Sequence, residues 1–130
     1  MAISDSTANF LTQIRNARRA KHRFVDVYKN RLHMEVIKIL KEQGFVDQFL
    51  VNDEKKKVRL FLKYSAAREP VMQDLKRFSK PGLRRYVGYR EIPKICGGLG
   101  IAILTTSKGL FEGEAARKLK IGGELICIVW

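Results

Sequence analysis

The chain has 130 residues, 45% of them hydrophobic, and a formal net charge of +13, so it is long enough to bury a core and strongly basic. This composition excludes an acidic disordered protein and indicates a polyanionic partner, nucleic acid first and an anionic membrane second. No apolar run approaches the roughly 20 residues of a membrane span, and the N-terminus lacks the continuous apolar stretch of a secretion signal. We therefore expect a cytoplasmic or organelle-matrix protein.

The first half predicts helices and strands in the order α-β-α-β-β. Ser4 or Asp5 is placed to cap a first helix, and a strand over residues 24–28 follows it. Asn30 is placed to cap a second helix, which Gly44 ends. Residues 45–51 indicate a strand, and residues 57–63 carry alternating apolar side chains. With a turn at 52–55 between them, they predict a β-hairpin.

The second half is predicted to be mainly β with short helices. Residues 64–70 are small and polar and end in a proline, which is typical of a linker. Residues 71–79 fit both a helix and a strand, and we favour a strand. Further elements are expected as strands over 83–87, 101–105 and 124–130, a turn over 80–82 and a short helix over 112–120. The prediction is an α+β fold of two small domains, residues 1–66 and 67–130.

The motifs that could indicate an enzyme are weak. Gly98-Leu99-Gly100 leads into a strand rather than a helix, which disfavours a dinucleotide loop. Ser107-Lys108 could form a catalytic dyad, but adjacent residues of an extended chain point to opposite faces. Cys96 and Cys127 lack metal-binding spacing and are expected to be buried free thiols. We therefore expect no catalytic residue, no metal and no cofactor.

The segment LTTSKGLF, residues 104–111, places small hydroxyl residues, a lysine and a glycine between two apolar runs. By itself it fits a plain hairpin turn. It also fits a reader of RNA, because small hydroxyl groups donate and accept hydrogen bonds and glycine permits close approach of the backbone.

Several motifs carry a resemblance that spans essentially the whole chain. They are Leu11-Thr12 with Ile14-Arg15-Asn16-Ala17, Lys80-Pro81-Gly82-Leu83-Arg84, Gly98-Leu99-Gly100-Ile101, Thr106-Ser107-Lys108-Gly109, Ala116-Arg117-Lys118, Gly122-Gly123-Glu124 and Val129-Trp130. In these motifs the chain resembles the family of the eighth protein of the small ribosomal subunit, in its bacterial and organellar form. Two departures stand out: Thr105 replaces a usual serine, and residues 112–115 replace Thr-Asp-Arg-Glu, so that Glu114 reverses a charge.

The resemblance implies a two-domain α+β structural protein that binds the central domain of small-subunit ribosomal RNA early in assembly and resides in the small subunit. It implies neighbouring small-subunit proteins as further partners, and no membrane, no small-molecule substrate, no cofactor and no catalysis. The candidate RNA-binding residues are Thr105, Thr106, Ser107, Lys108, Gly109, Tyr86, Arg84, Arg85, Lys80, Asn30 and Arg31.

Three alternatives remain open from the sequence. The chain could be a nucleic-acid-binding regulator that acts away from the ribosome, or a structural component held only by protein contacts. Tyr86 could stack on RNA or could be an ordinary core tyrosine.

Overall fold

The computed structural model describes residues 5–80 and 82–130, so Ser4 as a helix cap and Pro81 in the predicted turn lie outside the described residues. Contacts divide the chain between Gln73 and Asp74 into two compact units. The first unit comprises residues 9–73, and the second comprises 74–130 with the described residues before Asn9. The predicted domain boundary after residue 66 stays a prediction.

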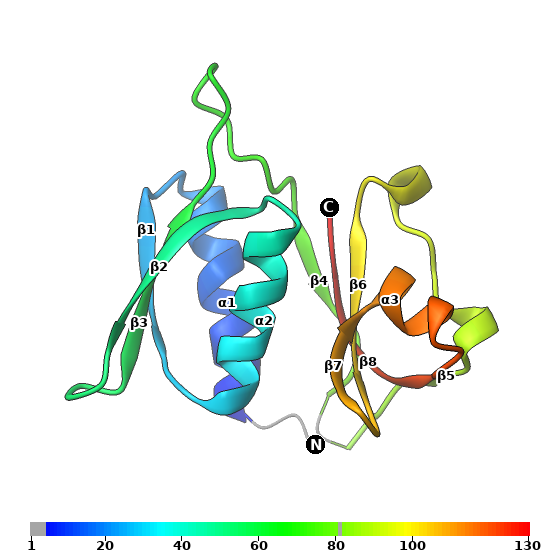
Figure 1. Ribbon diagram of the computed structural model, residues 1–130. Helices are drawn as coiled ribbons and strands as arrows, with labels where there is room; N and C mark the ends of the chain where they lie inside the picture. The colour runs from blue at the N-terminus through cyan, green and yellow to red at the C-terminus, as the bar shows by residue number, and fades with distance from the viewer. Residues whose placement is uncertain (1–4, 81) are drawn as a thin grey trace. The chain divides into compact units, whose positions relative to one another are not determined.

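The first unit is a three-stranded antiparallel sheet with helices on one face (Figure 1). Its elements are α1 (Asp5–Arg19) from Asn9 onward, β1 (Phe24–Tyr28), α2 (Arg31–Glu42), β2 (Val46–Asn52) and β3 (Lys57–Leu62). The strand order is β1-β3-β2. Val58, Leu60 and Leu62 are buried and alternate with more exposed residues along β3, as the period of two in the sequence predicted. The order α-β-α-β-β is therefore confirmed.

Local signals explain where α2 begins and ends. The Asn30 side chain accepts a hydrogen bond from the backbone N–H of His33 at 2.8 Å, which satisfies one of the donors left free at a helix start. Gly44 follows the helix with φ +84°, the left-handed conformation that glycine adopts readily. His33 itself is buried, with its ring stacked on Phe10 at 4.1 Å and its Nδ1 2.7 Å from the Tyr28 carbonyl oxygen.

The segment predicted as a linker is a loop that closes on itself within the first unit. Tyr64 and Pro70 form an isolated antiparallel bridge, and the N–H of Ser65 donates to the Glu69 carbonyl at 2.8 Å. Lys21, just beyond α1, forms an ion pair with the Glu69 carboxylate at 3.0 Å. These contacts hold the loop against the rest of the first unit.

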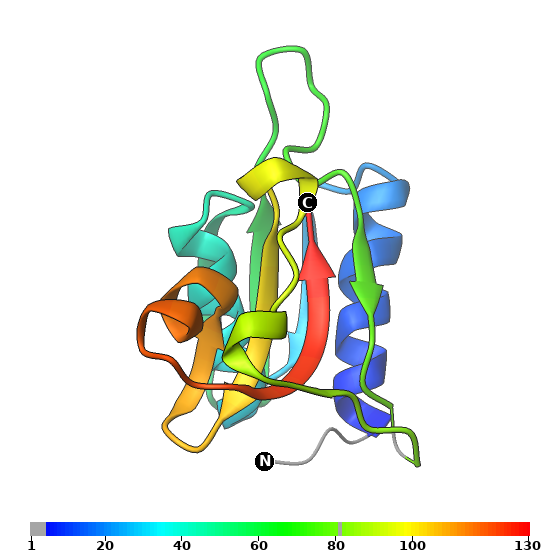
Figure 2. The ribbon, with the colours of Figure 1, turned by 90° about the vertical axis from the view of Figure 1, so that its right-hand side faces the viewer.

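The second unit is built on a five-stranded antiparallel sheet. Its elements are β4 (Leu75–Arg77), β5 (Tyr86–Val87), two 3₁₀ turns (Tyr89–Glu91 and Cys96–Gly98), β6 (Ile101–Thr106), β7 (Gly109–Glu112), α3 (Gly113–Lys118) and β8 (Gly123–Val129). The order is β4-β8-β6-β7, and β5 also pairs with β8. Figure 2 shows α3 and the turn at Tyr89–Glu91 lying over one face of this sheet. The buried cluster on that side is Ile92, Ala102, Leu104, Ala116 and Leu125.

Two elements of the second unit differ from the sequence prediction. The strand expected over 83–87 is only Tyr86–Val87, because Lys80 and Leu83 pair with each other and close a tight turn in front of it. The strand β7 is the second strand of the hairpin at residues 104–111. It continues to Glu112, which pairs with Ile103 of β6, whereas the sequence predicts that the short helix begins at Glu112. The strand favoured within 71–79 is confirmed at Leu75–Arg77, and the α+β class is confirmed.

Candidate nucleic-acid interface

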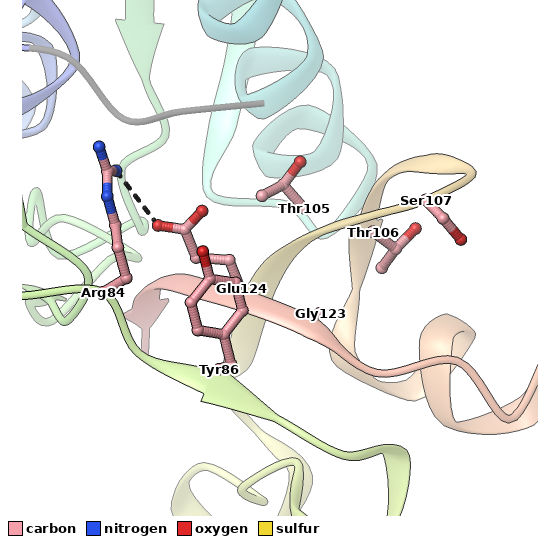
Figure 3. Close-up of a pocket in the computed structure, with 7 residues that line it drawn as sticks. All are labelled: Arg84, Tyr86, Thr105, Thr106, Ser107, Gly123 and Glu124. Atoms are coloured by element: carbon pink, nitrogen blue, oxygen red, sulfur yellow. Dashed lines mark hydrogen bonds and ion pairs between the residues drawn. The ribbon is translucent and has the colours of Figure 1, made fainter.

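A pocket of about 440 Å³ lies at one end of the second unit's sheet (Figure 3). It brings together five of the eleven candidate RNA-binding residues, which come from two separate stretches of the sequence. The lining residues are Arg84, Tyr86, Thr105, Thr106, Ser107, Gly123 and Glu124.

The pairing of three strands builds the pocket's central row. Tyr86 of β5 lies opposite Glu124 of β8, and Glu124 lies opposite Thr105 of β6. Residues directly opposite each other place their side chains on the same face of a sheet. The adjacent pair, Leu104 and Leu125, points to the other face and belongs to the core beneath α3. The row of Tyr86, Glu124 and Thr105 is therefore fixed by the same alternation that buries the core.

Tyr86 is the most exposed member of this row. Its exposed fraction is 71%, so it is not a core tyrosine in this structure. An exposed aromatic side chain between cationic residues presents a ring face on which a base or ribose can stack. The core alternative for Tyr86 is wrong, whereas stacking on RNA stays a prediction.

Glu124 is a buried carboxylate with two partners from the segment before β5. It is 5% exposed and accepts hydrogen bonds from the Ser79 hydroxyl and from Nη1 of Arg84, the latter at 3.3 Å. The Ser79 hydroxyl oxygen also accepts from the backbone N–H of Arg85 at 3.1 Å. This network attaches Ser79, Arg84 and Arg85 to β8 and holds the Arg84 guanidinium beside the pocket (Figure 3).

Ser79 and Glu124 were not among the predicted site residues. The only sequence signal was a lone carboxylate at the start of the apolar run ELICIVW. A carboxylate is rarely buried without partners, so its place in a buried strand indicated donors elsewhere in the chain, although not which ones.

Gly123 permits the close approach of β6 and β8 at the pocket. A Cβ atom at this position would lie 2.3 Å from the carbonyl oxygen of Thr105. A Cβ atom at Gly122 would lie 2.4 Å from the Val87 carbonyl oxygen. The two glycines therefore let the backbones of three strands come together.

The segment LTTSKGLF is a hairpin turn between β6 and β7. The Thr106 hydroxyl donates to the Gly109 carbonyl at 2.8 Å and accepts from the N–H of Lys108 at 3.2 Å. Gly109 has φ +118°, which a side-chain-bearing residue rarely adopts. The hydroxyl of Thr106 thus stabilises the turn, while Ser107 and Lys108 are exposed at its tip. The segment therefore has the geometry of a hairpin turn, as predicted, and this turn exposes the side chains of Ser107 and Lys108.

The remaining candidate residues lie apart from the pocket lining. Lys80 and Arg85 are exposed within the segment that Glu124 fixes, and the Arg85 guanidinium lies 5.3 Å from the Phe78 ring centroid. Asn30 and Arg31 belong to the first unit. There the Asn30 side chain caps α2, and the Arg31 side chain is 86% exposed, with its Nε 3.9 Å from a Glu35 carboxylate oxygen.

Comparison with known proteins decides the family. A profile described as ribosomal protein S8 matches residues 5–130. The chain is 48% identical over 133 residues to the small ribosomal subunit protein uS8 of Protochlamydia amoebophila, covering 100% of both chains. It is 50% identical over 129 residues to uS8 of Chlamydia pneumoniae, covering 98% of this chain and 97% of the relative. It is 47% identical over 132 residues to uS8 of Anaeromyxobacter sp. strain K, with full coverage of both.

The chain belongs to the ribosomal protein S8 family. The resemblance inferred from the sequence motifs is therefore confirmed. The family consists of structural, non-enzymatic ribosomal proteins, which confirms that the chain is not an enzyme.

Residues 112–115, which differ from the family's usual Thr-Asp-Arg-Glu, stabilise the start of helix α3. The Glu112 carboxylate accepts from the N–H groups of Glu114 and Ala115 at 3.0 and 3.3 Å and so caps α3. Glu114 pairs with Arg117, whose guanidinium also donates to the Ile92 carbonyl. Glu114, whose charge is opposite to that of the family's usual arginine, thus forms an ion pair within the short helix.

No cluster of three or more histidine, cysteine or acidic side chains suited to a metal occurs among the described residues. None of the described helices is long and apolar enough to cross a membrane. Cys127 is a buried free thiol whose pKa burial raises to about 12, as expected from the sequence, whereas the side chain of Cys96 lies outside the description.

Proposed function

We propose that this protein is a structural constituent of the small ribosomal subunit that binds the central domain of small-subunit ribosomal RNA and helps to assemble that region. The observation that carries the proposal is the pocket at the end of β6 and β8. There an exposed aromatic ring, an arginine and the hydroxyl-bearing strand end converge on one face. Its relatives are small ribosomal subunit proteins at about half identity over the whole chain.

The chemistry of the turn suits a deformed RNA helix. The shallow groove of such a helix exposes 2′-hydroxyls and base edges, which hydroxyl groups recognise as donors and acceptors. Ser107 is exposed at the turn and supplies that group, while Lys108 supplies a point charge for a phosphate. Because Thr106 and Gly109 fix the turn, little conformational freedom is lost when RNA binds.

The segment beside the turn adds stacking and charge. Tyr86 offers a ring for a base or ribose, and Lys80 and Arg85 are exposed cations for the phosphate backbone. Glu124 is a carboxylate in this site, but its burial and its pairing with Arg84 limit its repulsion of phosphate. Its role is to orient the cationic segment.

The first unit contributes a smaller part of the proposed RNA contact. The Arg31 side chain is exposed at the start of α2, where helix N–H groups also favour an anion. We assign it a phosphate contact. Asn30 acts through the cap that positions this helix end. Neighbouring small-subunit proteins complete the set of partners.

Binding to defined RNA fragments tests this function. The purified protein is titrated with a transcribed central domain of small-subunit ribosomal RNA and with a fragment of equal length from another domain. We expect tight binding to the central domain alone, with affinity falling about 10³-fold or more between 50 and 200 mM salt if six or more phosphates are contacted. Equal affinity for both fragments, or a nearly flat salt titration, contradicts the proposal.

Two further measurements separate the alternative functions. A regulator acting away from the ribosome sediments apart from the small subunit, whereas the proposed protein sediments with it. A component held only by protein contacts stays bound after ribonuclease treatment of isolated subunits, whereas a protein anchored by RNA is released.

A further inference from the structure

The sheet of the first unit has one face that no element of the same unit covers (Figure 1). Helices α1 and α2 pack against the opposite face, which buries Val27, Val58 and Leu60. The strand pairing places nine residues on the uncovered face in three cross-strand rows. They are Phe24, Phe61 and Gln48; then Asp26, Arg59 and Leu50; then Tyr28, Lys57 and Asn52.

Arg59 is held in one orientation at the centre of this face. Its Nε and Nη2 donate to the two carboxylate oxygens of Asp26 at 2.9 and 3.2 Å. Its guanidinium carbon lies 4.2 Å from the centroid of the Phe24 ring, which itself lies 6.0 Å from the ring of Phe61. The hydrogen bond from Arg59 also lowers the pKa of Asp26, so the carboxylate stays charged in neutral solution. The planar group is therefore fixed, and its side chain remains 47% exposed.

The next row offers a second ring beside exposed lysine side chains. Tyr28 is 50% exposed and lies opposite Lys57. Lys57 and Lys55 are exposed and have no ion-pair partner among the residues that the structure describes. A groove of about 490 Å³ runs along this part of the face. Its lining residues are Asp26, Leu50, Val51, Asn52, Lys55, Lys57 and Arg59.

We propose that this outer face, formed by β1, β3 and β2, binds a single-stranded segment of RNA. One base stacks on the guanidinium plane of Arg59 above Phe24, and another base of the same segment stacks on Tyr28. Their phosphates lie near Lys55 and Lys57. Arginine planes and aromatic rings are the groups on which unpaired bases stack. Phe24, which lies beneath the Arg59 guanidinium, and Tyr28 are four residues apart on β1, about 13 Å along the strand, a distance that an extended single strand spans with one nucleotide between the two stacked bases.

Charge favours RNA over a protein at this face. Three of the seven residues that line the groove are cationic and one is acidic, which complements a phosphate backbone. Charged residues are depleted from the centre of protein–protein interfaces, whereas here they occupy the middle of the groove. The exposed apolar side chain of Leu50 lies beside Arg59 and offers a contact for a ribose or base edge.

This inference depends on the proposed RNA-binding function but concerns a different surface, so the two can fail separately. The full chain is titrated with a fluorescent eight-nucleotide oligoadenylate, and binding is followed by anisotropy. We expect Tyr28→Ala and Arg59→Lys each to weaken this binding about tenfold, because one removes a ring and the other removes the planar guanidinium while keeping the charge. We expect Lys57→Ala to lower the salt slope by about one unit.

Matched variants control for folding and for charge. Leu99→Ala removes an 86% exposed side chain from the second unit, and Lys38→Ala removes an exposed lysine from α2, so both are expected to bind the oligonucleotide like the parent. Ser107→Ala is expected to keep oligonucleotide binding and to lose affinity only for the central-domain fragment. If that variant alone loses function while the sheet variants match their controls, the proposed function stands and this inference falls.

A crosslinking experiment in assembled subunits distinguishes RNA from protein as the occupant. A photoreactive amino acid replaces Gln48, which is exposed on the same face. Crosslinks from isolated small subunits to ribosomal RNA support the proposal. Crosslinks to protein alone overturn it, as does oligonucleotide binding that Tyr28→Ala and Arg59→Lys leave unchanged.

Discussion

The hydroxyl of Ser79 and the carboxylate of Glu124, 45 residues apart in the chain, are hydrogen bonded inside the second unit. Both residues are buried, with exposed fractions of 0% and 5%. Arg84 and the backbone of Arg85 complete the network, so one carboxylate at the start of β8 orients the cationic segment beside the candidate RNA pocket. The network connects the stability of this unit with the geometry of the pocket.

Ser79→Ala tests the contribution of this network to stability. The change leaves the Glu124 carboxylate buried with one donor fewer, so we expect the free energy of unfolding to fall by about 1–3 kcal/mol, measured by urea denaturation. Ser107→Ala is the matched control, because its hydroxyl is exposed and its loss should change stability by less than about 0.5 kcal/mol. Equal unfolding midpoints for Ser79→Ala and the parent contradict a stabilising role.

Ser107→Ala and Lys108→Ala are expected to impair RNA binding in different ways. Loss of the Ser107 hydroxyl removes a specific hydrogen bond, which should cost about 1–3 kcal/mol on the central-domain fragment and little on unrelated RNA. Its salt slope should not change, because no charge is lost. Lys108→Ala should weaken both RNAs evenly and lower the salt slope by about one unit. The measurement is binding of both variants to both RNAs across a salt series.

An unchanged affinity of Ser107→Ala for the central-domain fragment would show that the segment is only a turn. Recognition would then have to come from Arg84, Arg85 and the start of α2.

Replacement of Tyr86 tests stacking on RNA. Because its side chain is 71% exposed, we expect Tyr86→Ala to fold like the parent by circular dichroism and to lose about 1–3 kcal/mol of RNA-binding free energy. Tyr86→Phe keeps the ring and should largely preserve affinity. Similar losses in both variants would assign the effect to the hydroxyl instead of the ring.

The buried His33 predicts a fall in stability on acidification. Burial lowers the pKa of this imidazole, although its hydrogen bond to the Tyr28 carbonyl opposes the shift. The unfolded chain takes up the proton near pH 6.5, above the folded pKa. The stabilisation is therefore complete above pH 6.5 and is lost as the pH falls from there through the folded pKa.

Urea denaturation between pH 7.5 and 5 measures this dependence. His33→Phe keeps the stack on Phe10 but removes the titrating group, so its stability should fall less over this range than that of the parent. His22→Gln, which replaces the exposed histidine of the chain, is the matched control for removing a histidine. An identical pH profile for His33→Phe and the parent would show that another group is responsible.

Gly123→Ala tests the close approach of β6 and β8. The added Cβ would lie 2.3 Å from the Thr105 carbonyl oxygen, so the strands must separate and we expect a loss of about 1–3 kcal/mol of stability together with weaker RNA binding. Gly88→Ala is the control, because a Cβ there meets no atom within 4 Å. If Gly123→Ala melts and binds RNA like Gly88→Ala, the glycine is not required for the pocket.

Elements with local signals were predicted correctly from the sequence. Asn30 and Gly44 bound α2, the alternation along residues 57–62 predicts β3, and the apolar run before Trp130 predicts β8. Each signal lies within a few residues of the structure that it specifies, because caps, turns and strand periodicity are short-range effects. The motifs that identified the family are local for the same reason.

The pocket depends on contacts that no local pattern encodes. The sequence determined an α+β chain with a basic surface, an RNA-reading candidate in residues 104–111 and its family. Only the tertiary structure decided that β5 is limited to Tyr86–Val87 and that β7 continues to Glu112. It also decided that Tyr86 and Thr105 meet across Glu124 and that Ser79 is the partner of that carboxylate. The physical reason is register: the pairing of strands far apart in sequence sets which side chains become neighbours, and the composition of each strand alone leaves that pairing open.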